Sequence, residues 1–245
     1  MPRKKSKSKP NTSDNKILIG VTIIIIIALV IITMTPNNKS SGKLETTDKI
    51  KIAYNYFPSK NNPETNKGII LLHQFGLNKE SYKDLIPELK DYHVIALDSR
   101  GFGESDLDYT KFKNFDFQTM INDVNTAIVF LNEKNVDKIG IIGASIGANT
   151  ALNAAKEFRD IKTAILLSPG LEYRGINIEE TSKLVKKPIL IIVTNGDEYS
   201  FISSRILGQN LEDSNLIVLG GNEHGVNLFS ESVKKDIVAW LKDNL

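Results

Sequence analysis

The sequence predicts an α/β protein whose strands form a doubly wound, mostly parallel β-sheet. After residue 44, short runs rich in isoleucine, valine and leucine alternate with longer segments of helical periodicity. This alternation is typical of parallel sheets covered by helices on both faces. Several runs, such as GIILL and ILIIV, are almost wholly apolar, as expected of strands buried on both faces.

The elements follow one another in a regular order. The expected strands are Lys51–Phe57, Gly68–Leu72, His93–Leu97, Lys138–Ile142, Thr163–Leu167, Ile189–Val193 and Leu216–Leu219. The expected helices are Asn78–Lys90, Phe117–Glu133, Ile146–Phe158, Ser200–Leu211 and Ser230–Lys242. The last helix has an apolar face that includes Val233, Ile237, Trp240 and Leu241, and Ser230 is its expected N-cap. Because chemistry in such sheets lies at the carboxyl ends of the strands, functional residues are expected in the loops after them.

The N-terminal residues have a different composition. Residues 1–16 are rich in lysine and arginine, and residues 17–34 (ILIGVTIIIIIALVIITM) carry no charge. As a helix, about 18 residues rise about 27 Å, close to the roughly 30 Å of a bilayer core. The positive-inside rule then predicts a basic cytoplasmic tail, a single transmembrane helix and an extracytoplasmic remainder.

A cleaved signal peptide, which would release a secreted protein, is the alternative. Signal peptides have apolar cores of about 7–15 residues and a small-residue cleavage site, whereas this run is longer and is followed by TPNNKSSG. We therefore predict a transmembrane signal anchor over residues 17–34. A flexible linker over residues 35–43, rich in Asn, Ser and Lys, would join it to a folded domain over residues 44–245.

Composition excludes several kinds of site. The chain has no cysteine, which rules out disulfides, a cysteine nucleophile and thiolate zinc sites. Its net charge of +2 is concentrated in the basic tail, so a nucleic-acid partner is not expected. No metal-ligand cluster or phosphate-binding lysine motif stands in the sequence, so no metal and no cofactor are expected.

One motif indicates nucleophilic catalysis. Gly143-Ala144-Ser145-Ile146-Gly147 lies between an expected strand and an expected helix, which is the setting of the G-x-S-x-G nucleophile elbow. Side chains at residues 143 and 147 would collide with neighbouring backbone in so sharp a turn. We predict Ser145 as the nucleophile; the alternative is a tight structural turn with an incidental serine.

The serine needs a base to accept its proton. The Ser…Asp/Glu…His order favours His224, in the loop after the last strand. His73 is interpreted as a structural histidine that braces a loop, and His93 as a surface or packing residue. Asp197 is the favoured acid of a Ser-Asp-His triad, but Glu198 is adjacent, and either carboxylate could instead cap the helix that follows.

An oxyanion hole requires two backbone N–H donors. One is expected from Ile146, immediately after the nucleophile. The other is expected from the loop after GIILL, at Phe75.

These motifs resemble those of the α/β-hydrolase superfamily over nearly all of residues 44–245. The matching blocks are His73-Gln74-Phe75-Gly76, the stretch from Asp98 to Ser105 (DSRGFGES), Gly143 to Gly147, Asp197, and His224-Gly225. The DSRGFGES block resembles a structural glycine turn, and LSPGLEYRG and NGDEYS are similar to segments of small dienelactone-hydrolase-like enzymes. Two features depart from the pattern: the superfamily's usual His-Gly is His73-Gln74 here, and serine replaces the cysteine of dienelactone hydrolases.

The resemblance implies the α/β-hydrolase fold and a serine esterase acting on small carboxylic esters. Only about 20 residues separate Ser168 from the strand at Ile189, so little or no cap domain is expected. An amidase or peptidase with the same triad, and an inactive hydrolase-fold binding protein tethered to the membrane, remain alternatives. The expected partners are a small-molecule ester or amide and, through residues 17–34, membrane lipid; the sequence does not indicate the oligomeric state.

Overall fold

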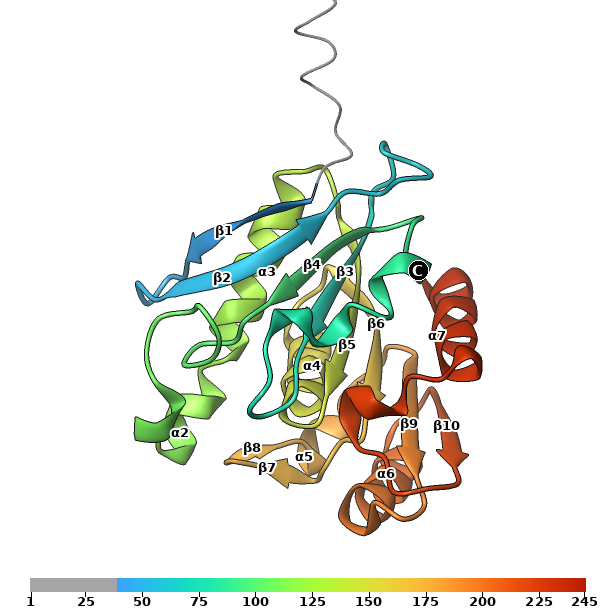
Figure 1. Cartoon of the computed structure of the whole chain (residues 1–245). Coiled ribbons are helices and arrows are strands. Elements are labelled where there is room, and N and C mark those ends of the chain that lie inside the picture. The colour runs from blue at the N-terminus through green and yellow to red at the C-terminus, as the bar shows by residue number, and fades with distance from the viewer. Residues whose placement is uncertain (1–38) are drawn as a thin grey trace, which may run out of the picture. The chain divides into compact units, whose positions relative to one another are not determined.

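The parallel strands form the centre of one eight-stranded sheet in the computed structural model, which describes residues 39–245 (Figure 1). Its strand order is β1-β2-β4-β3-β5-β6-β9-β10. The pairs β1–β2 and β2–β4 are antiparallel and the other pairs are parallel. The strands are β1 (Ser40–Glu45), β2 (Lys51–Phe57), β3 (Lys67–Leu72), β4 (His93–Leu97), β5 (Lys138–Ala144), β6 (Ile161–Leu167), β9 (Ile189–Thr194) and β10 (Ser214–Leu219). The predicted mostly parallel α/β sheet is confirmed.

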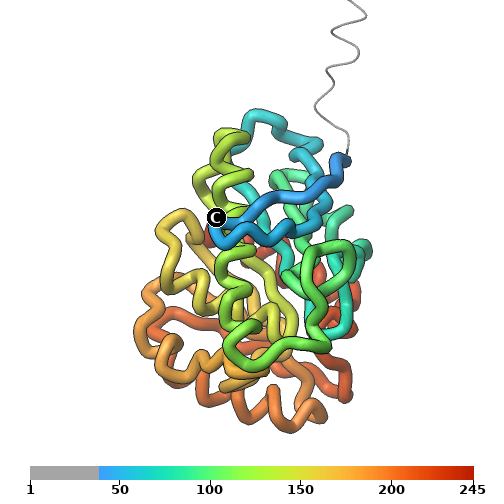
Figure 2. Tube along the Cα trace, turned by 90° about the vertical axis from the view of Figure 1, so that its left-hand side faces the viewer, coloured from blue at the N-terminus to red at the C-terminus, as the bar shows by residue number. Residues whose placement is uncertain are grey.

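Helices cover both faces of the sheet. They are α2 (Asn114–Gln118), α3 (Ile121–Asn132), α4 (Ile146–Glu157), α5 (Glu179–Ser182), α6 (Glu198–Asn210) and α7 (Glu231–Asn244). Strand β3 shows how alternation divides the core, because successive side chains point to opposite faces. Ile70 and Leu72 pack in the core beneath α3 and α4, whereas Ile69 and Leu71 pack on the side of α7. The edge strands β1 and β10 lie far apart in both views (Figures 1 and 2).

The C-terminal helix agrees with its prediction in detail. The Ser230 hydroxyl accepts a hydrogen bond from the Val233 N–H at 3.3 Å, as an N-cap does. Val233, Ile237 and Leu241 are buried. Trp240 is half-buried, and its Nε1 donates to Thr163 Oγ1 at 2.8 Å.

Two predicted helices are wrong in extent. Residues 78–90 form two short 3₁₀ helices, Lys79–Tyr82 and Ile86–Glu88. Pro87 explains the interruption, because it lacks an N–H and disfavours the α conformation at the residue before it. Residues 117–133 are divided between α2 and α3 at Thr119, whose hydroxyl donates to the Asp116 carbonyl and accepts from Arg100.

The linker predicted over residues 35–43 is wrong for residues 40–43, which belong to β1. Ser40 pairs with Tyr56 and Lys43 with Ala53. Most side chains of β1 are exposed, and polar and charged side chains suit an exposed edge strand. The folded domain therefore begins before residue 44.

The predicted anchor lies outside the described residues, since residues 17–34 belong to the part of the chain for which no structure is described. Between residues 39 and 245, no helix combines the length and apolar character needed to cross a membrane.

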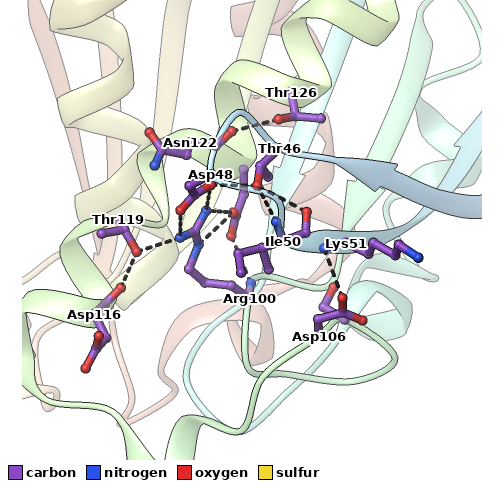
Figure 3. Close-up of polar contacts among 12 residues, drawn as sticks. Thr46, Asp48, Ile50, Lys51, Arg100, Asp106, Asp116, Thr119, Asn122 and Thr126 are labelled. Atoms are coloured by element: carbon purple, nitrogen blue, oxygen red, sulfur yellow. Dashed lines mark hydrogen bonds and ion pairs between the residues drawn. The ribbon is translucent and has the colours of Figure 1, made fainter.

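A buried ionic cluster fixes the loop after β4 (Figure 3). Arg100 is 2% exposed, and its guanidinium contacts Asp123 at 2.8 Å and Asp48 at 2.6 Å. Burial raises the pKa of Asp123 to about 6, whereas the hydrogen bond from Arg100 lowers the pKa of Asp48. Gly103 belongs to the same loop, and a Cβ there would lie 2.2 Å from a carboxylate oxygen of Asp98. These contacts support the structural interpretation of the DSRGFGES block.

Candidate active site

Ser145 occupies a strained turn between β5 and α4. Its backbone has φ 53° and ψ −119°, and a positive φ is uncommon for a residue other than glycine. Such a conformation costs about 1–3 kcal/mol and persists only where the surroundings enforce it. The Ser145 N–H donates to the Leu167 carbonyl at 2.8 Å. The turn places the serine at the N-terminus of α4 and at the carboxyl edge of the sheet.

Glycines on both sides allow this turn to pack. A Cβ at Gly143 would lie 2.1 Å from the Gly147 carbonyl oxygen. A Cβ at Gly147 would lie 2.4 Å from the carbonyl oxygen of Leu72 and 2.7 Å from that of His73. Real Cβ atoms do not come so close to backbone, so a side chain at either position would displace the turn. The first turn of α4 is thereby held against the end of β3.

Asp197 and His224 meet at the same edge. Asp197 follows β9 as the N-cap residue of α6, and His224 follows β10. His224 Nδ1 lies 2.6 Å from Asp197 Oδ2. Since the carboxylate accepts, Nδ1 donates, and Nε2 then carries the lone pair that a general base needs. Of the two candidate acids, Asp197 makes this contact, whereas Glu198 is an exposed residue in the first turn of α6.

The two expected oxyanion donors lie in adjacent segments. Ile146 is the first residue of α4, and Phe75 belongs to the loop after β3. The close approach of Gly147 to the end of β3 brings these segments together. The Phe75 ring is fixed edge-on against Phe102 and Tyr109, with centroid distances of 5.5 and 5.1 Å.

A small hairpin crosses the edge of the site. Strands β7 (Glu172–Tyr173) and β8 (Ile176–Asn177) are joined by Arg174-Gly175, both with positive φ, as in a type I′ turn. The hairpin lies beside the carboxyl ends of the central strands (Figure 1). It forms with α5 the whole insertion between β6 and β9, which agrees with the expectation of little or no cap domain.

The Tyr173 side chain extends from this hairpin towards Ser200 and His224. Its hydroxyl lies 2.9 Å from Ser200 Oγ, and its ring stands edge-on to the His224 ring at 6.4 Å. Burial raises the pKa of the Tyr173 phenol, while the hydroxyls of Ser200 and Ser145 act in the opposite direction. Ser145 is 7% exposed, so little of its side chain is open to solvent. No sequence motif marks Tyr173 itself; the Arg174-Gly175 turn that follows it is the one local signal for the hairpin that carries it.

The other two histidines are structural. The His73 Nδ1 donates to the Gln74 carbonyl at 2.8 Å, and its Nε2 accepts from the Ser99 N–H at 3.0 Å. Burial lowers the pKa of His73, which favours the neutral ring. His93 Nδ1 lies 2.7 Å from the Tyr56 hydroxyl. Throughout residues 39–245, no group of three or more His, Asp or Glu side chains is arranged to hold a metal ion.

Comparisons with known proteins agree with this architecture. A family model described as alpha/beta hydrolase fold matches residues 68–185. The chain is 31% identical over 119 residues to a probable alcohol acetyltransferase of Cyberlindnera fabianii, an alignment that covers 45% of this chain and 30% of that protein. It is 29% identical over 133 residues to Lipase 1 of Psychrobacter immobilis, covering 54% and 41%. The chain thus spans less than half the length of either curated relative.

Solved structures extend the similarity to the whole fold. An esterase of Pyrococcus furiosus superposes with a TM-score of 0.71 and 20% identity, covering 85% of this chain and 91% of that one. The family match lies on the segment that carries the serine turn, and the structural match covers most of the sheet. The chain therefore has the α/β-hydrolase fold, and residues 68–185 match the family model of that description.

Proposed function

We propose that the chain is a serine hydrolase that cleaves small carboxylic esters through an acyl-enzyme on Ser145. The observation that carries the proposal is the 2.6 Å contact between Asp197 and His224 at the sheet edge where Ser145 lies in its strained turn. Fixed pairing of an acid with a histidine orients the imidazole and stabilises the imidazolium that forms during catalysis.

The proposed reaction follows from these groups. Ser145 Oγ attacks the ester carbonyl carbon while His224 Nε2 accepts the hydroxyl proton. The N–H groups of Ile146 and Phe75 stabilise the oxyanion. The imidazolium then gives its proton to the departing alcohol, and a water molecule, activated in the same way, releases the acid from the acyl-enzyme.

Two further observations support small substrates. The insertion between β6 and β9 is only a short hairpin and α5, and Ser145 is 7% exposed. Relatives named as an esterase, a lipase and an alcohol acetyltransferase share acyl transfer through an ester, which supports the reaction class.

A fluorophosphonate probe tests this proposal, because it labels activated serines. We expect the full-length protein to be labelled, the Ser145→Ala variant to remain unlabelled and the His224→Ala variant to react far more slowly. A screen of short-chain esters and matched amides would then define the substrate. If the folded parent protein resists labelling, the chain is instead a hydrolase-fold binding protein.

We also propose that residues 17–34 span the cytoplasmic membrane once. The N-terminus would lie in the cytoplasm and the hydrolase domain on the outer side of the membrane. The uncharged apolar run and the preceding basic residues support this topology. Membrane fractions should retain the protein after alkaline extraction, and protease added outside should digest only the domain. Release of a shortened protein into the medium would instead indicate a cleaved signal peptide.

A further inference from the structure

Three side chains contact the backbone on either side of His224. Thr194 Oγ1 donates to the Glu223 carbonyl at 2.8 Å, ahead of the histidine. Beyond it, Ser168 Oγ accepts from the Gly225 N–H at 3.0 Å. Gln74 Oε1 accepts from the Val226 N–H at 2.8 Å. We call Gln74, Ser168 and Thr194 the His224 clasp; they come from the carboxyl ends of β3, β6 and β9.

Gln74 makes the longest-range of these contacts. It lies 152 residues before Val226, in the loop that also carries Phe75. The contact depends on glycine at residue 225, where φ is +60° and a Cβ would lie 2.1 Å from Gln74 Oε1. One side chain thus connects the segment of the expected oxyanion donor with the segment of the expected base.

Ser168 connects the same segment with the nucleophile. Its buried hydroxyl accepts from Gly225, and the preceding residue, Leu167, accepts the Ser145 N–H through its carbonyl at 2.8 Å. The three parts of the proposed reaction centre are therefore linked through the Gln74 side chain and through the consecutive residues Leu167 and Ser168.

We propose that Gln74 is a positioning residue that acts through His224. Its amide oxygen holds the Val226 N–H and thereby fixes the imidazole relative to Ser145 and the Phe75 N–H. This inference rests on the proposed function. Acyl transfer is sensitive to such placement, because a misplacement of about 1 Å can reduce the rate by about 10²-fold. Gln74 is also the residue that departs from the superfamily's His-Gly pattern, and this contact gives that departure a role.

The test compares two substitutions in the full-length protein. Gln74→Met has a similar length but no amide acceptor, whereas Gln74→Glu retains an oxygen acceptor. We expect Gln74→Met to lower kcat for p-nitrophenyl acetate about 10–100-fold with little change in KM, because orientation rather than substrate binding is lost. Gln74→Glu should recover most of kcat.

Gln209→Met is the matched control. Gln209 is exposed on α6, so this substitution makes the same chemical change away from the site. It should keep the parental kcat. A parental kcat in Gln74→Met, or a loss confined to KM, would overturn the inference.

Amide hydrogen exchange separates this inference from the proposed function. We expect exchange at Val226 to become about fivefold faster or more in Gln74→Met, as for the loss of one hydrogen bond of about 1 kcal/mol. If the parent protein has no esterase activity and no probe labelling, the proposed function fails, and exchange at Val226 still decides whether Gln74 holds the loop. Unchanged exchange there contradicts the inference.

Discussion

Two groups of ionisable residues lie at the same carboxyl edge of the sheet, but the protein encloses them to different degrees. The buried ionic cluster after β4 consists of Arg100, Asp123 and Asp48, and we call it the Arg100 cluster. Its centre is closed, because the side chains of Arg100 and Asp123 are 3% and 1% exposed. The Asp197–His224 pair is partly open, with side-chain exposures of 15% and 33%. The contacts of the closed cluster stabilise the fold. In the open pair, Asp197 contacts only Nδ1 of His224, so Nε2 remains available to accept a proton. Substitutions in the two groups should therefore separate stability from activity.

Asp197→Asn should produce the largest effect and change activity alone. The amide can hold the wrong tautomer of His224, and the corresponding change in a Ser-His-Asp triad lowers kcat by about 10⁴-fold. Ester hydrolysis measures this loss, and thermal unfolding should show little change, because the side chain is partly exposed and similar in shape. A variant that retains most of its activity would remove Asp197 from the triad and direct attention to Glu198.

Asp123→Ala should lower the stability of the fold and leave the activity of the folded protein nearly unchanged. It leaves the buried Arg100 guanidinium without its one buried carboxylate partner, and breaking a buried pair costs about 3–5 kcal/mol of unfolding free energy. Denaturant unfolding measures that loss. The activity of the molecules that remain folded should stay near the parental value; a specific loss of kcat would show that the Arg100 cluster also shapes the site.

Features of the fold and site could be predicted from the sequence where the signal is local, and could not where it depends on contacts between distant segments. Strands such as β3 and β9 could be predicted because their apolar, isoleucine-rich runs carry the signal locally. Strand β1 could not, since its polar residues become a strand only by pairing with β2. Ser145, Asp197 and His224 could be placed at one edge because each follows an apolar strand. The contact of Gln74 with Val226 depends on side-chain packing between distant loops, which no local pattern encodes.

The Arg100 cluster should also give stability a pH dependence. Burial raises the pKa of Asp123 in the folded protein to about 6, above the value of about 3.9 in an unfolded chain. The folded state therefore binds this proton more tightly, so the contribution is full below about pH 4 and is lost as the pH rises towards 6. Asp123→Asn cannot titrate. The unfolding free energy of the parent, relative to this variant, should fall by about 1–3 kcal/mol between pH 4 and 6; a constant difference would argue against the raised pKa.

Asp48→Ala should have the smallest effect, although Asp48 contacts the same guanidinium as Asp123. The Asp48 side chain is 38% exposed, and exposed ion pairs contribute about 0–1 kcal/mol. Its contribution should shrink further in high salt, because screening acts on exposed charges more than on buried ones. Thermal unfolding at low and high ionic strength measures both effects, with Asp123→Ala as the salt-insensitive comparison. A loss from Asp48→Ala as large as that from Asp123→Ala would show that the turn between β1 and β2, rather than burial at α3, holds Arg100 in place.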